Sequence, residues 1–119
     1  MIRTAGLAVV ALALAGACAE ARTPYDGTWS VLIVTQKGDC DRAYRYPVRI
    51  ANGVVGYAGE ASFNVSGRVT GKGSVTVSVT RGQARADGSG RLSANSGSGS
   101  WRGKSSGASC SGSWTAERR

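Results

Sequence analysis

The chain contains no histidine among its 119 residues. Without an imidazole, neither a Ser-His-Asp nor a Cys-His catalytic arrangement can form. The single methionine is Met1, so an internal thioether is also lacking, and tyrosine is the remaining candidate ligand for a haem iron. Metal centres built on imidazole or thioether are therefore excluded, and the sequence predicts no metal ion and no cofactor.

Long apolar segments are also scarce. The longest, "AGLAVVALALAGA" at residues 5–17, is 13 residues long, whereas a transmembrane helix needs about 20. It follows the basic Arg3 and precedes an A-x-A sequence at residues 19–21, which is typical of a cleaved signal peptide. We expect residues 1–21 to be a signal peptide and the exported chain, periplasmic or secreted and without a transmembrane span, to begin at Arg22.

The cysteines also bear on whether the chain is exported and how its signal is processed. There are three, Cys18, Cys40 and Cys110. "LAGAC", which ends at Cys18, is also close to a lipoprotein signal, so a lipid anchor at Cys18 is the alternative to simple secretion. Cleavage or lipidation leaves an even pair in an exported chain, and this predicts a Cys40–Cys110 disulfide.

Alternation of apolar and polar residues dominates after residue 22, and no helical periodicity of useful length appears. Asn52-Gly53 predicts a tight hairpin turn. The segment "KSSGAS" at 104–109 is expected to be a loop, and "QARADGSGRLSA" one long strand or two short ones. The other expected strands are 28–35, 43–50, 54–58, 62–70, 74–80, the stretch around Trp101 and 110–118.

Seven or eight short strands in one domain at residues 22–119 predict an all-β fold with one disulfide. An antiparallel meander of this kind must close or stack to protect its edges. A single up-and-down barrel, or a barrel-like meander, is the predicted architecture. A two-sheet β-sandwich is the alternative.

Short motifs support a barrel. "DGTW" at the start of the first strand, with "SWTAERR" in the last, resembles lipocalin-like and avidin-like barrels, in which a first-strand tryptophan packs near the end of the last strand. Trp29 and Arg118 are the residues concerned. More broadly, "YDGTWSV", "CDRAYRYPVRI", "VSGRV" and "CSGSWTAERR" resemble small exported alphaproteobacterial β proteins of unknown function. This resemblance implies export and a β fold, and it transfers no catalytic or binding residue.

Five aromatic residues fall on the inward phase of their strands. They could fill a packed core, or they could line a pocket for a small apolar or aromatic ligand at one barrel mouth. The candidate ligand-binding residues are Trp29, Tyr44, Tyr46, Trp101 and Trp114.

Acidic residues are few, seven against fifteen lysines and arginines, for a net charge of +8. Six arginines fall on the outward phase and could bind an anionic envelope component, or could serve solubility alone. Nucleic acid is disfavoured, because the chain is expected to be exported and its aromatics are not interleaved with the arginines. The candidate anion-binding residues are Arg45, Arg49, Arg68, Arg85, Arg91 and Arg102.

Asp39 and Asp41 are the only closely spaced carboxylate pair that could serve acid–base chemistry. Turn acids that pair with Arg42 or Arg45 are the simpler interpretation, and we expect no enzyme. The sequence thus predicts an exported, non-enzymatic small barrel that binds a small apolar or aromatic ligand. The alternative is a basic interaction protein that docks on anionic envelope surfaces or inhibits an envelope enzyme.

Overall fold

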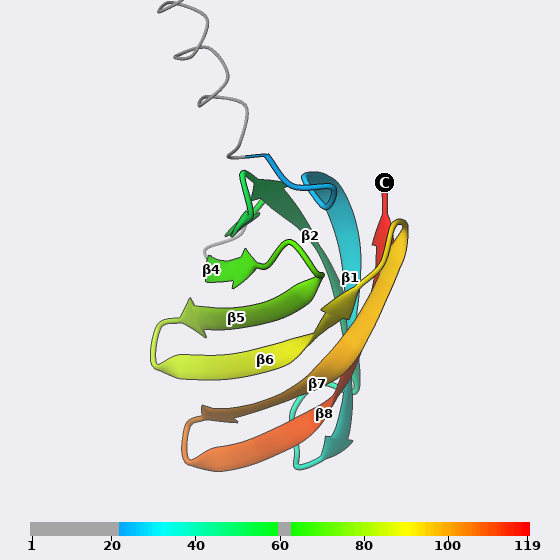
Figure 1. The fold of residues 1–119 in the computed structure, drawn as a ribbon. Coiled ribbons are helices and arrows are strands. Elements are labelled where there is room, and N and C mark those ends of the chain that lie inside the picture. Colours follow the sequence, from blue (N-terminus) through cyan, green and yellow to red (C-terminus); the bar gives the residue numbers. More distant parts are fainter. Residues whose placement is uncertain (1–21, 60–62) are drawn as a thin grey trace, which may run out of the picture.

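Eight antiparallel strands form a closed barrel in this computed structural model, which describes residues 22–59 and 63–119. The chain runs up and down around the barrel, and β1 pairs with both β2 and β8 to close it (Figure 1). The strands are β1 (Gly27–Lys37), β2 (Ala43–Ala51), β3 (Val54–Tyr57), β4 (Asn64–Val69), β5 (Ser74–Arg81), β6 (Ala84–Leu92), β7 (Ser96–Ser105) and β8 (Ala108–Arg118). The barrel prediction is confirmed, and the sandwich alternative is wrong because the first and last strands share hydrogen bonds.

Local sequence accounts for the turns. Asn52 and Gly53 both have positive φ, 54° and 78°, as a two-residue hairpin turn requires. Ser106 and Gly107 adopt the same conformation, with φ of 50° and 84°. The expected loop at 104–109 is therefore wrong. It is a two-residue turn, and the strands on either side extend to Ser105 and from Ala108.

The predicted disulfide is present between Cys40, in the β1–β2 loop, and Cys110, in β8. Because such bonds persist outside reducing compartments, the bond indicates a non-cytoplasmic location. The expected signal peptide at 1–21, with Cys18, lies outside the described residues. In the part of the chain that the structure describes, no helix has the length and apolar character needed to cross a membrane.

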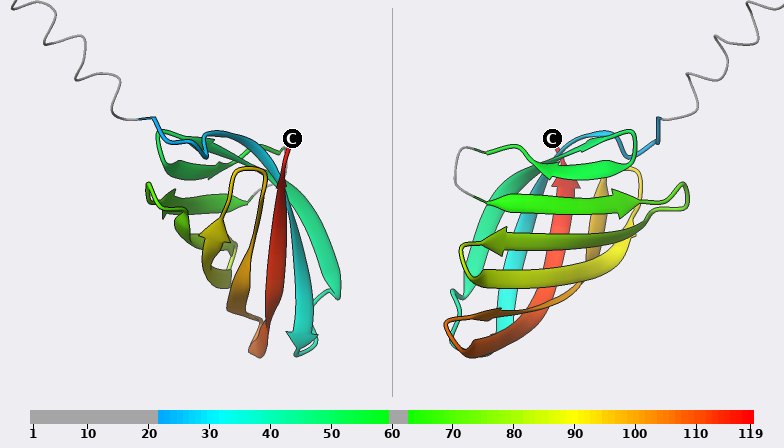
Figure 2. Two further views of the ribbon diagram at one scale, coloured as in Figure 1. Left: turned by 45° about the vertical axis from the view of Figure 1, so that its right-hand side comes forward. Right: turned by 90° about the vertical axis from the view of Figure 1, so that its left-hand side faces the viewer.

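One end of the barrel, which we call the sealed end, carries segment 23–26 and the turns at 52–53, 70–73 and 93–95 (Figure 2). Segment 23–26 crosses this end. Asp26 accepts hydrogen bonds from the backbone N–H groups of Asn52 and Gly53, at 2.7 and 3.2 Å. The Tyr25 hydroxyl lies beside Gly73 of the β4–β5 turn. The segment therefore ties the chain entry to two separate hairpins.

Arg118 at the end of β8 completes the closure. Its guanidinium donates to the carbonyl oxygens of Pro24, Asp26 and Ala94, at 2.7–2.9 Å. The central carbon of the guanidinium group also lies 4.7 Å from the centre of the Trp29 ring, within the range of a cation–π interaction. Trp29 is 1% exposed and donates its indole N–H to the Tyr25 carbonyl, at 2.9 Å.

Candidate functional site

The two halves of the barrel interior are filled to different extents. Among the described residues, most buried apolar side chains lie towards the sealed end: Trp29, Val48, Ile50, Val55, Val69, Val75, Leu92 and Ala116. Tyr46 and Cys110 are also buried but lie nearer the other end. Further along the same inward rows, Val31, Ile33, Val77, Trp101 and Trp114 remain half-buried. Since these side chains face inward, their remaining exposure comes from the interior, which is open towards the other end. We call that end, with the 38–42 loop and the turns at 82–83 and 106–107, the mouth.

An apolar cavity of about 70 Å³ occupies the interior. Valine, isoleucine, leucine and alanine side chains line most of it, with Trp29, Tyr46, Trp101 and Trp114. Asp87 also borders it, but its carboxylate is exposed and binds Arg85 and Ser78. The cavity wall is thus apolar.

Glycines form part of the inner wall. Gly88, Gly90, Gly99 and Gly112 lie on the inward rows of β6, β7 and β8, and of these four Gly88 lines the cavity. A Cβ at Gly88 would make only ordinary contacts, the nearest at 3.4 Å. The interior next to Gly88 therefore has room for a side chain that the sequence does not supply.

Two tryptophans lie along this glycine wall in opposite directions. Trp114 on β8 lies over Gly99 and Gly90, whose added Cβ atoms would come within 2.7 and 2.6 Å of its ring. Its indole N–H donates to the Ser89 carbonyl on β6, at 3.2 Å. Trp101 on β7 faces Gly112 and donates to the Val34 carbonyl on β1, at 3.1 Å. Both indole donors are satisfied by backbone, so these rings present apolar surface to the cavity.

An aromatic cluster forms part of the mouth. Tyr44, Tyr46, Tyr57 and Phe63 have ring centres 5.4–6.1 Å apart, which is a favourable separation for aromatic pairs. Arg81, on the inward phase at the end of β5, places its guanidinium carbon 5.1 Å from the Phe63 ring centre. Burial, followed by the nearby Tyr44 and Tyr57, raises the pKa of Tyr46 to about 12, so its hydroxyl is neutral at physiological pH.

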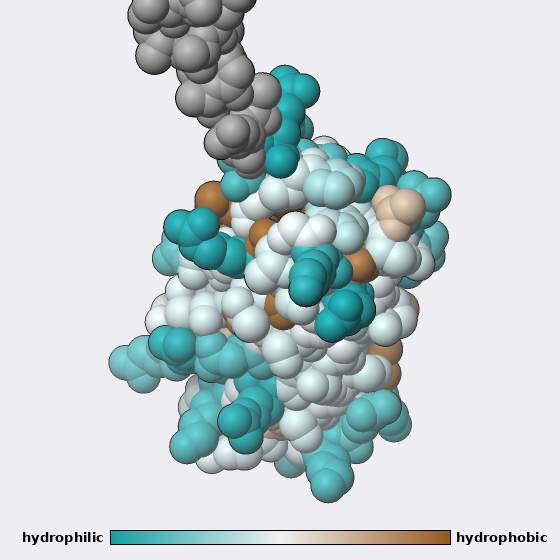
Figure 3. Space-filling view, in the orientation of Figure 1, coloured by the Kyte–Doolittle hydropathy of each residue, from teal (hydrophilic) through white to brown (hydrophobic). Residues whose placement is uncertain are grey.

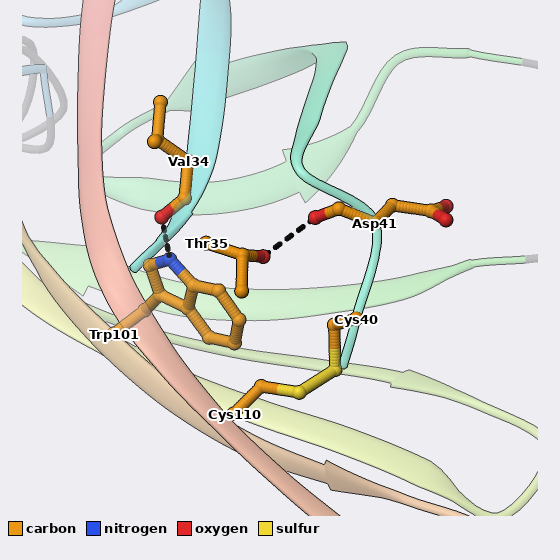
Figure 4. The surroundings of a disulfide bond; sticks show 6 residues. All are labelled: Val34, Thr35, Cys40, Asp41, Trp101 and Cys110. Carbon is orange, nitrogen blue, oxygen red and sulfur yellow. Dashed lines mark hydrogen bonds between the residues drawn. A yellow bond between two sulfur atoms is a disulfide. The ribbon is translucent and has the colours of Figure 1, made fainter. Parts of the chain in front are cut away.

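The disulfide holds the β1–β2 loop at the mouth (Figure 4). Thr35 adds two hydrogen bonds to this loop, from its backbone N–H to the Arg42 carbonyl (2.9 Å) and from its hydroxyl to the Asp41 carbonyl (2.6 Å). The Trp101 indole lies nearby, on β7. The disulfide therefore fixes the β1–β2 loop next to Trp101.

Four of the five aromatic candidates, Trp29, Tyr46, Trp101 and Trp114, line the cavity. Tyr44 does not. It is 40% exposed and packs at the rim against Tyr46 and Phe63 with its ring tilted to both. Tyr57, Phe63 and Arg81 complete the rim but were not among the sequence candidates. The two-residue alternation in β5, which places Val75, Val77 and Val79 inside, also places Arg81 inside and would have identified it.

The carboxylate pair does not converge on this cavity. Asp39 and Asp41 are exposed on the 38–42 loop, and neither lines the interior. Figure 4 shows the Asp41 carboxylate pointing away from Trp101 and the disulfide. Among residues 22–59 and 63–119, no group of three Cys, Asp or Glu side chains is arranged to hold a metal ion.

The six candidate arginines are all exposed, but they do not form one patch. Arg45 donates to the Ser30 hydroxyl at 2.9 Å, and Arg85 forms an ion pair with Asp87 at 3.1 Å. The hydrogen bonds from Arg85 and Ser78 hold the pKa of Asp87 below its usual value, and Arg102 contributes to this shift. The other three arginines precede core residues of the sealed end: Arg49 before Ile50, Arg68 before Val69 and Arg91 before Leu92.

The outer wall around this interior is mostly small and polar. The outward rows of β5 to β8 are rich in serine and threonine, with isolated charged residues. Figure 3 shows the corresponding face as largely near-neutral, with hydrophilic side chains in separate groups and only small apolar spots. On this face of the barrel the outward side chains are therefore mainly small or polar.

Comparison of the chain with protein-family models, curated proteins and solved structures finds no match.

Proposed function

We propose that this chain is an exported binding protein that takes a small apolar or aromatic ligand into the mouth of its barrel, and that it acts by binding and not by catalysis. The observation that carries the proposal is the unfilled, apolar interior of the barrel. A cavity of about 70 Å³ lies between the buried residues of the sealed end and the half-buried valines and tryptophans beyond them, at the position where a ligand would replace the missing contacts.

The dimensions limit the ligand. An apolar protein cavity of about 150 Å³ holds one benzene ring, so the present cavity of about 70 Å³ takes only part of a ligand. The remainder would lie against the aromatic rim of Tyr44, Tyr57 and Phe63. An elongated apolar molecule, with one narrow end inside and its body on the rim, fits this arrangement.

The polarity of the wall supports an apolar ligand. The indole donors of Trp101 and Trp114 are already bonded to backbone. In the described chain, no buried side-chain nitrogen or oxygen lacks a hydrogen-bond partner. A polar ligand would lose its bonds to water on entry and gain none from these groups. The resemblance to lipocalin-like and avidin-like barrels belongs to the same proposal.

The uncharged fluorophore N-phenyl-1-naphthylamine tests the proposal. We expect saturable enhancement of its fluorescence in the presence of the protein, together with a change in tryptophan emission, because Trp101 and Trp114 line the cavity. Gly88→Leu fills the space beside these rings and should weaken binding at least tenfold, since the added methylenes occupy the site.

Gly56→Leu is the matched control. Gly56 lies on the outward phase of β3, and a Cβ there would meet nothing within 4 Å. This variant adds the same side chain outside the barrel and should bind the fluorophore as the unaltered chain does. Absence of saturable binding to the unaltered chain, or equal binding by the Gly88→Leu variant, would contradict the proposal.

A further inference from the structure

Exposed cations surround the sealed end. Among the described residues at the sealed end, six cationic side chains are exposed, against one acidic side chain, that of Glu117. Asp26 and Arg118 are engaged in the hydrogen bonds that close the end and do not add to its outer charge. The six cations are Arg22, Arg49, Arg68, Lys72, Arg91 and Arg119.

The register spaces three of these cations over alternate strands. Arg49 is on β2, Arg68 on β4 and Arg91 on β6. Arg68 lies opposite Thr76, and Arg91 opposite Ser74, on the two sides of β5. Strands lie about 4.8 Å apart, so neighbouring arginines are about 10 Å apart laterally. This is comparable with the screening length at physiological salt, and an anionic surface would interact with them jointly.

The mouth carries a weaker charge bias. Its exposed cations are Lys37, Arg42, Arg45, Arg81, Arg85 and Lys104, and in the described part of the chain three exposed carboxylates, those of Asp39, Asp41 and Asp87, accompany these six. Asp39 and Asp41 lie in the loop between Lys37 and Arg42. The positive field is therefore stronger at the sealed end.

The sealed end also exposes one apolar side chain. Val54 is 48% exposed, follows the Asn52-Gly53 turn and lies directly opposite Arg68 across the β3–β4 pair. Among the described residues, the other large apolar side chain that is exposed, that of Tyr44, is at the mouth. A valine between exposed cations can enter the headgroup region while its neighbours contact phosphate.

The chain also enters the barrel at this end. Arg22 immediately precedes the closing segment 23–26, and the apolar sequence at 5–17 and Cys18 lie just upstream. Four residues span at most about 14 Å. Any attachment of Cys18 to a membrane would hold the sealed end within that distance of the bilayer.

We propose that the sealed end docks on an anionic phospholipid surface through its cations and Val54, with the mouth facing away from the bilayer. This orientation leaves the cavity accessible from the aqueous side. The inference does not depend on the ligand proposed above, because docking uses the opposite end of the barrel.

Vesicle co-sedimentation tests the proposal. The chain carries Cys18→Ser, which removes lipidation, and is recovered in processed form from the expressing host. Vesicles contain phosphatidylglycerol and phosphatidylcholine in equal parts, or phosphatidylcholine alone. We expect binding to the anionic vesicles only, with loss of binding near 1 M salt, where the screening length is about 3 Å. Neutralising Arg68, Lys72 and Arg91 to Gln should weaken binding on the order of 100-fold, about fivefold per cation.

The matched variant neutralises Lys37, Arg42 and Lys104 at the mouth to Gln. It removes the same charge and should change vesicle binding by less than about threefold, because these groups lie more than a screening length from the docked surface. Equal weakening by the two triple variants would show that net charge alone acts and would overturn the proposal. Absence of vesicle binding at low salt, or binding to an acidic polysaccharide without binding to vesicles, would also overturn it.

Discussion

The two ends of the barrel are stabilised in different ways. At the sealed end, large apolar side chains are buried, and segment 23–26 and Arg118 satisfy backbone groups across the opening. Towards the mouth, the small residues Ala86 and Gly88 face the interior on β6, and a disulfide holds the β1–β2 loop. Burial and hydrogen bonds therefore stabilise one end, while a covalent bond constrains the other.

This difference shows how a barrel of this size can keep interior space. A chain of about 100 residues has little surplus stability, so an unfilled cavity must be offset elsewhere. The disulfide stabilises the fold mainly by restricting the unfolded chain, and its buried Cys110 takes up only the mouth end of the inward row of β8. The structure thus separates the part that supports folding from the part available to a ligand.

The largest expected effect comes from emptying the sealed end. Trp29→Ala removes a side chain that is 1% exposed, its hydrogen bond to Tyr25 and its contact with Arg118. We expect a loss of about 5 kcal/mol in the free energy of unfolding. Tyr44→Ala, which removes a 40% exposed aromatic at the mouth, should cost about 1 kcal/mol. Urea denaturation of both variants measures the contrast, and similar losses would refute the distinction between the ends.

The next largest effect concerns the covalent bond at the mouth. The disulfide links residues 70 positions apart, and replacing both cysteines by alanine should lower the free energy of unfolding by about 4 kcal/mol in the chain-entropy model. Amide hydrogen exchange should increase most in β1 and β8 near Thr35 and Gly112, and least at the sealed end. An equal increase in amide hydrogen exchange along the whole of β1 and β8 would show that the disulfide does not act locally at the mouth.

Much of the fold could be predicted from the sequence, because local rules determine it. Strict alternation in β5 and the Asn52-Gly53 turn each specify structure within a few residues. The disulfide followed from counting the cysteines. The turn at Ser106-Gly107 was missed, since a serine with positive φ is uncommon and polar residues on both sides resemble a loop.

The candidate site could be predicted only in part, because it depends on register between distant strands. Alternation placed Trp101, Trp114 and the late glycines inside, but only the pairing of β6, β7 and β8 shows which glycines lie beside each tryptophan. The distribution of the arginines between the two ends of the barrel also depends on strand register. Six exposed cations look alike in sequence, and their grouping depends on which strand ends meet at which end of the barrel.

The smallest expected effect is the response to pH, which should differ in sign between the ends. Burial opposes ionisation of Asp26, but hydrogen bonds from Thr23, Asn52 and Gly53 outweigh it and lower the Asp26 pKa. A lowered folded-state pKa contributes stability above the unfolded value of about 3.9, and this stability is lost as the pH falls through the folded value.

The alkaline response concerns Tyr46, whose pKa is raised to about 12. It contributes stability below the unfolded value of about 10, and this stability is lost as the pH rises towards 12. Asp26→Asn should therefore flatten the acidic limb of a melting-temperature profile and Tyr46→Phe the alkaline limb. If Asp26→Asn flattened the alkaline limb and Tyr46→Phe the acidic limb, or if neither variant changed the profile, the two groups would not govern the pH response of their respective ends.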